Sequence, residues 1–141
     1  MFKLDPRLSS DTLQIASWPL CEVLLMNDSH FPWLILVPKI SGATELYHLT
    51  KNQRIQLDAE SIFLSETLMK LYQGTRLNVA ALGNVVSQLH IHHVVRFQTD
   101  SAWPAPVWGK FAAKPYEEDA LNQQIKMLAP IIEHKFLSAC V

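Results

Sequence analysis

The order of apolar and polar residues along the chain predicts four strands. Apolar runs of strand length lie at residues 21–26, 32–38 and 76–82, and a fourth run, 85–97, alternates between apolar and polar side chains. The turn-forming sequence Asn27-Asp28-Ser29-His30 joins the first two runs, which indicates an antiparallel hairpin. With a helix before the third strand and another after the fourth, the order predicts an α+β fold with an antiparallel sheet.

The first predicted helix covers residues 59–73. Its apolar residues are spaced to form one helical face, and they are Leu64, Leu68, Leu71 and Tyr72. Asp58 is a suitable N-cap, Glu60 suits the positive first turn, and Gly74 suits the C-terminal end.

The second predicted helix covers residues 116–135, and Pro130 is expected to kink or interrupt it. Residues 4–20 have a weaker pattern, for which we expect a short helix capped by Ser10 or Asp11. Residues 41–50 are expected to form a loop or a short helix.

Composition limits the classes of partner. The chain has 141 residues, of which 49% are apolar, so we expect a single domain over 1–141. The net charge of −1 gives no electrostatic reason to expect binding to nucleic acid or to an anionic membrane. Cys21 and Cys140 are far apart and are expected to be reduced thiols. With no apolar run of transmembrane length and no signal core, a cytoplasmic protein is expected.

The fourth strand carries the candidate chemistry. Alternation in an extended strand places two sets of side chains on opposite faces. One set is Gln88, His90, His92, Val94 and Arg96, and the other is Leu89, Ile91, His93, Val95 and Phe97. The first face presents two imidazoles and an amide, whereas the second is apolar apart from one histidine. We therefore expect His93 to be a core histidine with satisfied hydrogen bonds.

Three interpretations of the polar face compete. The histidines can be structural residues of an ordinary strand. They can share a metal, as in cupin barrels, but Arg96 stands four residues after His92, where an anionic ligand is required. Alternatively, one imidazole attacks phosphorus as a nucleophile and the other protonates the leaving group.

Gly83 to His92, with the sequence Gly-Asn-Val-Val-Ser-Gln-Leu-His-Ile-His, resembles the Gly-Gln-x-x-x-His-x-His-x-His signature of the histidine triad (HIT) superfamily. Residues 25–39 resemble the nucleoside-binding hairpin of that family, and Leu77-Asn78 matches the strand before the triad. The resemblance covers about residues 20–110, and about residues 116–137 are expected to form a C-terminal helical extension. It implies a HIT-like fold with about five antiparallel strands, a helix on the sheet and a C-terminal helix.

The resemblance also implies a function and a site. It implies a homodimeric hydrolase or transferase that acts at the α-phosphate of a nucleotide conjugate, with no metal or cofactor. His90 corresponds to the nucleophile and His92 to the last triad histidine, expected to be the general acid. Asn84 and Gln88 correspond to positions that hold the phosphate or orient the nucleophile. Asn27, or else Asp28, corresponds to the ribose contact.

The chain also departs from the family pattern. Gln88 replaces the first triad histidine, and Trp33 replaces a further histidine that many members carry. The alternative function is therefore a nucleotide-binding module with little or no turnover. Arg96 can bind a phosphate or be a solvated residue at the end of a strand. The loop aromatics Trp103, Trp108 and Phe111 can stack on a base, or they can pack onto the core.

Overall fold

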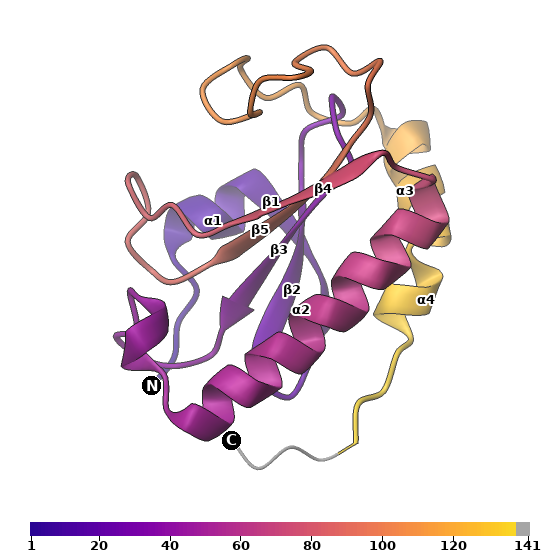
Figure 1. Ribbon diagram of the computed structural model, residues 1–141. Coiled ribbons are helices and arrows are strands. Elements are labelled where there is room, and N and C mark those ends of the chain that lie inside the picture. The colour runs from indigo at the N-terminus through magenta and orange to yellow at the C-terminus, as the bar shows by residue number, and fades with distance from the viewer. Residues whose placement is uncertain (138–141) are drawn as a thin grey trace.

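The computed structural model describes residues 1–137 and contains a five-stranded antiparallel sheet (Figure 1). The strands are β1 (Thr12–Ser17), β2 (Cys21–Met26), β3 (Trp33–Pro38), β4 (Arg76–Ala80) and β5 (Ile91–Arg96). Their order across the sheet is β1-β2-β3-β5-β4, and each neighbouring pair is antiparallel. The helices are α1 (Pro6–Asp11), the 3-10 turn η1 (Leu46–His48), α2 (Lys51–Tyr72), α3 (Glu118–Met127) and α4 (Ala129–Ile132). The predicted α+β class and its antiparallel sheet are confirmed.

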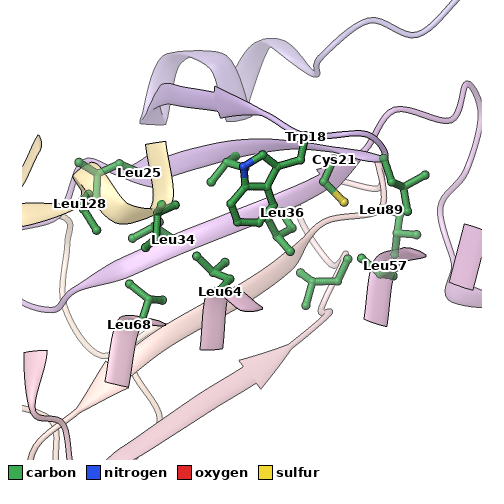
Figure 2. Packing of buried hydrophobic residues seen from close by; sticks show 14 of the residues in the cluster. Trp18, Cys21, Leu25, Leu34, Leu36, Leu57, Leu64, Leu68, Leu89 and Leu128 are labelled. Atoms are coloured by element: carbon green, nitrogen blue, oxygen red, sulfur yellow. The ribbon is translucent and has the colours of Figure 1, made fainter. Parts of the chain in front are cut away.

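Each face of the sheet has its own hydrophobic cluster. On one face, α2 crosses the sheet with α3 and α4 beside it (Figure 1). Figure 2 shows Leu64 and Leu68 of α2 packing with Leu25, Leu34 and Leu36 of the sheet. The opposite face packs against α1 and the loop that follows β5, and its cluster includes Leu8, Leu24, Ile35, Val94, Ala102 and Val107. The second face is the one on which His92 lies.

Helix α2 begins eight residues earlier than predicted. Its N-cap is Thr50, whose side chain accepts the backbone N–H of Gln53, while the Gln53 side chain accepts the backbone N–H of Thr50. This is a capping box, a stronger start signal than the Asp58 that we predicted. Glu60 therefore lies inside the helix, where its buried carboxylate accepts the backbone N–H groups of Leu20 and Cys21 at 2.9 Å each.

Gly74 does not end α2 in the way predicted. Gln73 takes the left-handed conformation at the helix end, with φ 54°. Gly74 is instead required by a close approach, because a Cβ atom on it would lie 2.4 Å from Cγ1 of Val95. The close approach of Gly74 to Val95 places the end of α2 against β5.

The first 20 residues contain the predicted short helix, but its predicted cap is wrong and a strand was missed. Asp5 accepts the backbone N–H of Arg7 and, with Pro6 in the first turn, starts the helix α1 before the predicted cap at Ser10 or Asp11. The chain then turns into β1, an edge strand that pairs with β2. We missed this strand because only one of its two faces packs on the core.

Other boundaries differ by smaller amounts. Strand β5 begins at Ile91 instead of near residue 85, because residues 81–90 form a loop before the pairing with β3 and β4 starts. The predicted last helix is interrupted at Leu128, and Pro130 lies in the first turn of the short helix α4. Cys21 is buried, and Cys140 lies outside the described residues. Within residues 1–137, no helix has the length and apolarity to cross a membrane.

Candidate active site

A cavity of about 640 Å³ opens over the face of the sheet that carries His90 and His92. Its floor is formed by these two histidines with Trp33 and Ile35 of β3. Its walls come from four segments that are distant in sequence: α1 with the start of β1, the end of β2 together with Asp28, the loop 82–86, and the loop 107–113. The volume is within the usual range for a small-molecule site.

His90 is oriented by its own backbone neighbourhood. Its Nδ1 lies 2.7 Å from the carbonyl oxygen of Gln88. Because a carbonyl only accepts hydrogen bonds, Nδ1 must carry the proton, and the neutral ring keeps its lone pair on Nε2. His90 is 6% exposed and lines the cavity. The arrangement suits an imidazole that acts as a nucleophile through Nε2.

His92 is held in the opposite tautomer. The indole Nε1 of Trp33 donates to Nδ1 of His92 at 3.0 Å, so the neutral ring carries its proton on Nε2. Burial, with a contribution from the neighbouring His90 and His93, lowers the pKa of His92 to about 3. A ring with this pKa is neutral near pH 7. The role of His92 as the general acid stays a prediction. A neutral Nε2–H can still donate a hydrogen bond.

His93 points to the other face, as the alternation of the strand predicts. It is fully buried and lies 2.7 Å from the hydroxyl of Ser61 through Nε2 and 3.1 Å from the carbonyl oxygen of Ile91 through Nδ1. Burial lowers its pKa to about 4, although the hydrogen bond to Ile91 acts in the other direction. The expectation of a core histidine with satisfied hydrogen bonds is confirmed.

Of the two candidate ribose contacts, only Asp28 lines the cavity. It is 4% exposed, and it accepts the backbone N–H groups of His30 and Lys114 and lies 2.7 Å from Nδ1 of His30. All of these contacts end on Oδ1, so Oδ2 keeps its acceptor capacity. Asn27 is turned away and accepts the backbone N–H of Tyr116 at 2.9 Å.

Gln88 does not line this cavity. Its side chain accepts the backbone N–H of Asp5 and donates to the carbonyl oxygen of Lys3, both at 2.8 Å. These bonds tie down the N-terminal segment, which we define as residues 1–11. The expectation that the Gln88 amide contacts a substrate phosphate is therefore corrected, whereas its backbone carbonyl does orient His90.

Arg96 is also absent from the cavity lining. It is 2% exposed and makes a bidentate pair with Asp100, through Nε at 2.8 Å and Nη2 at 3.0 Å. Its remaining donors reach the side-chain oxygen of Asn78 and the carbonyl oxygen of Ala105, both at 2.8 Å. Neither predicted role holds, because Arg96 is buried and does not line the cavity. It stabilises the loop that follows β5.

The loop aromatics divide between the site and the fold. Trp108 and Phe111 line the cavity, and the Trp108 ring lies 5.4 Å from that of His92. Trp103 instead lies under the guanidinium of Arg96, 5.6 Å from its centre. Two of the three aromatic residues that the sequence suggested for base stacking therefore line the cavity.

The loop between β4 and β5 supplies another predicted residue. Asn84 is exposed and lines the cavity. The preceding Gly83 has φ +72°, a left-handed conformation that favours glycine. The Gly-Asn pair therefore lies in the loop at the cavity rim, and the phosphate contact of Asn84 stays a prediction.

Sequence reasoning missed the contribution of the N-terminal segment. Arg7, Leu8 and Asp11 line the cavity, so its wall holds a guanidinium, an aliphatic group and a carboxylate. The start of α1 at Asp5-Pro6 was readable from the sequence, but no local signal places this helix against the histidines. Among residues 1–137, no group of three or more His, Cys, Asp or Glu side chains is arranged to hold a metal ion.

Comparisons with known proteins agree with this geometry. The sequence matches the HIT domain family over residues 7–99. The structure is similar to a histidine triad protein from Marinobacter aquaeolei, with a TM-score of 0.92 and 50% identity, covering 94% of this chain and 97% of that chain. A histidine triad protein from Bradyrhizobium japonicum has a TM-score of 0.90 and 38% identity, with 93% and 98% covered. One from Sinorhizobium meliloti has a TM-score of 0.87 and 38% identity, with 90% and 94% covered.

A comparison with curated proteins found no match. The similar bacterial structures nevertheless cover nearly the whole of this chain, and the family match covers well over half of it. The expected resemblance and the HIT-like fold are thus confirmed: the chain belongs to the HIT domain family.

Proposed function

We propose that this protein is a nucleotide hydrolase or transferase that acts at the α-phosphate of a nucleotide conjugate, with His90 as the nucleophile. The observation that carries the proposal is the 2.7 Å contact between Nδ1 of His90 and the carbonyl oxygen of Gln88. It keeps the lone pair on Nε2, so the ring can attack phosphorus without first losing a proton. Membership of the HIT family supports a nucleotide as the ligand.

The lining of the cavity supplies suitable contacts for the rest of a nucleotide. Asp28 offers Oδ2 to a ribose hydroxyl, and Trp108 and Phe111 offer aromatic surface to a base. Asn84 offers an amide to a phosphate oxygen, and Arg7 is the cation in the wall. The family resemblance also implies a homodimer, which light scattering on the purified protein would test.

The alternative is a nucleotide-binding module with little turnover. Two observations favour it: the Gln88 side chain is bound to the N-terminal segment, and His92 is neutral because its pKa is low. Both possibilities require nucleotide binding, so affinity alone does not separate them.

Trapping of a covalent phosphohistidine separates the two. The protein is mixed with a radiolabelled nucleotide conjugate, quenched in base and analysed for label on His90. His90→Ala should lower turnover by several powers of ten while nucleotide affinity changes only a few-fold, because the nucleophile contributes mainly in the transition state. His48→Ala, at the exposed turn η1, is the matched control. Label that persists in His90→Ala, or activity above about a tenth of the parent, would exclude His90 as the nucleophile.

A further inference from the structure

Trp33 and His92 form a buried hydrogen bond in the floor of the cavity. The indole Nε1 of Trp33 lies 3.0 Å from Nδ1 of His92, and the two residues are 6% and 8% exposed. An indole N–H only donates, so Nδ1 of His92 must be the acceptor. The bond joins neighbouring strands, since Trp33 is on β3 and His92 on β5.

This hydrogen bond determines where His92 can hold protons. A neutral ring that accepts at Nδ1 carries its single proton on Nε2. A second proton on Nδ1 would direct two N–H groups at each other across 3.0 Å and would leave the indole donor without an acceptor. For His92 to act as a general acid, Nδ1 must hold a proton while Nε2 releases one. Trp33 opposes that state.

We infer that Trp33 is a positioning residue that keeps His92 a neutral Nε2–H donor, and that the protein acts on nucleotide conjugates whose leaving group departs as a weakly basic oxyanion, such as sulfate or a phosphate ester. The inference rests on the proposed function and names its substrate class. A leaving oxyanion of this kind needs a hydrogen bond but no proton. An amine needs a proton before it can leave, and this site has no suitable donor in His92.

The reaction balances without a general acid. The Nε2 lone pair of His90 forms a bond to the α-phosphorus, and the bond from phosphorus to the leaving oxygen breaks, with its electron pair departing on the oxyanion. His90 keeps its Nδ1 proton on the carbonyl of Gln88. Water then attacks phosphorus, the phosphorus–nitrogen electrons return to His90, and one proton of the water passes to solvent. The products are a nucleoside monophosphate, the oxyanion and a proton.

The residues around His92 also disfavour a protonated ring. The ring lies against Trp33 at 5.6 Å, Trp108 at 5.4 Å and His90 at 4.9 Å between centroids. None of these neighbours is an acid that would stabilise an imidazolium. Burial accordingly lowers the pKa of His92.

Nitrogen-15 NMR of histidine-labelled protein tests the tautomer directly, whether or not a substrate is known. In the parent, His92 should show the pattern of a neutral Nε2–H ring at pH 7. Trp33→Phe keeps an aromatic ring but removes the donor, so His92 should become a mixture of tautomers. Trp108→Phe is the matched control, because Trp108 also contacts His92 but its Nε1 has no hydrogen-bond partner in the described part of the chain. A Nδ1–H ring or an imidazolium in the parent overturns the inference.

Kinetics test the substrate class. Adenosine 5′-phosphosulfate and adenosine 5′-phosphoramidate share a nucleoside and differ in the leaving group. The parent should process the phosphosulfate about 100-fold faster or more, since a missing general acid typically costs a factor of 10² to 10⁴. Trp33→Phe should narrow that ratio, because Nδ1 of His92 is then free to take a proton. If the parent protein prefers the phosphoramidate, the inferred substrate class is wrong while the proposed function stands. Failure to turn over either compound overturns the proposed function and the substrate class with it, while the NMR result still decides the role of Trp33.

Discussion

Replacement of Asp100 with asparagine should destabilise the fold strongly, although Asp100 lies outside the cavity lining. The side chains of Asp100 and Arg96 are 5% and 2% exposed. The carboxylate accepts two N–H groups of the guanidinium and the backbone N–H groups of Phe97, Ala102 and Trp103. An asparagine has one acceptor oxygen, and its NH₂ group would face donors.

The expected loss is about 3–5 kcal/mol, the usual cost of removing one partner of a buried ion pair and leaving the other charged. A typical domain has a free energy of unfolding of about 5–15 kcal/mol, so the change would be a large fraction of the total. The shift in the pKa of Asp100 also indicates that the ionised carboxylate stabilises the fold. Burial alone would raise this pKa, but the hydrogen bonds from Arg96 and the backbone lower it to about 2. This contribution is therefore present above about pH 4 and is lost as the pH falls towards 2.

Urea unfolding at pH 7, monitored by tryptophan fluorescence, measures the change as a shift in midpoint at constant slope. Asp58→Asn is the control: Asp58 is exposed on α2, and its replacement should change the free energy of unfolding by less than about 0.5 kcal/mol. At pH 2.5 the difference between parent and Asp100→Asn should shrink. A loss below about 1 kcal/mol at pH 7 would contradict the reasoning, because it would mean that the Arg96 charge does not depend on Asp100.

Three further predictions concern the residues around the histidines. Gln88→Leu should leave the fold intact but release the N-terminal segment, so limited proteolysis should cleave that segment faster and nucleotide binding should weaken. Unchanged cleavage and affinity would show that the two hydrogen bonds of Gln88 do not hold the segment. The free energy of unfolding should fall by about 2 kcal/mol for each of His92 and His93 between pH 7 and pH 5, because a histidine in the unfolded chain has a pKa near 6.5 whereas the pKa values in the folded protein are about 3 and 4. Equal free energies of unfolding in urea titrations at the two pH values would refute this. Dialysis against a chelator should change neither activity nor melting temperature, because Trp33 already occupies Nδ1 of His92; stoichiometric metal lost together with activity would contradict it.

The sequence was most informative where the pattern has a simple period. The alternation from His90 to Arg96 correctly separated His92 and Val94 from His93 and Val95, because a strand allows only two faces. The hairpin of β2 and β3 was predicted within one residue, since apolar runs flank a turn of polar residues. The start of α2 was also encoded, in Thr50 and Gln53, but the polar first turns hid it.

The roles of individual polar side chains were less predictable, because they depend on partners far away in sequence. Gln88 is bound to Lys3 and Asp5, more than 80 positions earlier. Arg96 pairs with Asp100, and its remaining N–H groups donate to Asn78 and to the carbonyl oxygen of Ala105. Strand alternation gives the face of a side chain, whereas tertiary packing decides whether that face meets ligand or protein.

The attachment of the N-terminal segment to Gln88 has a practical consequence for anyone who purifies this protein. The backbone carbonyl of Lys3 accepts a hydrogen bond from the side chain of Gln88, and the backbone carbonyl of Gln88 orients His90. A tag fused ahead of Met1 would therefore join the chain two residues from Lys3. An affinity tag at this point would extend the same N-terminal segment that supplies Arg7 and Leu8 to the cavity wall. Assays of turnover and ligand affinity should therefore compare protein that carries a tag at this point with protein from which the tag has been removed.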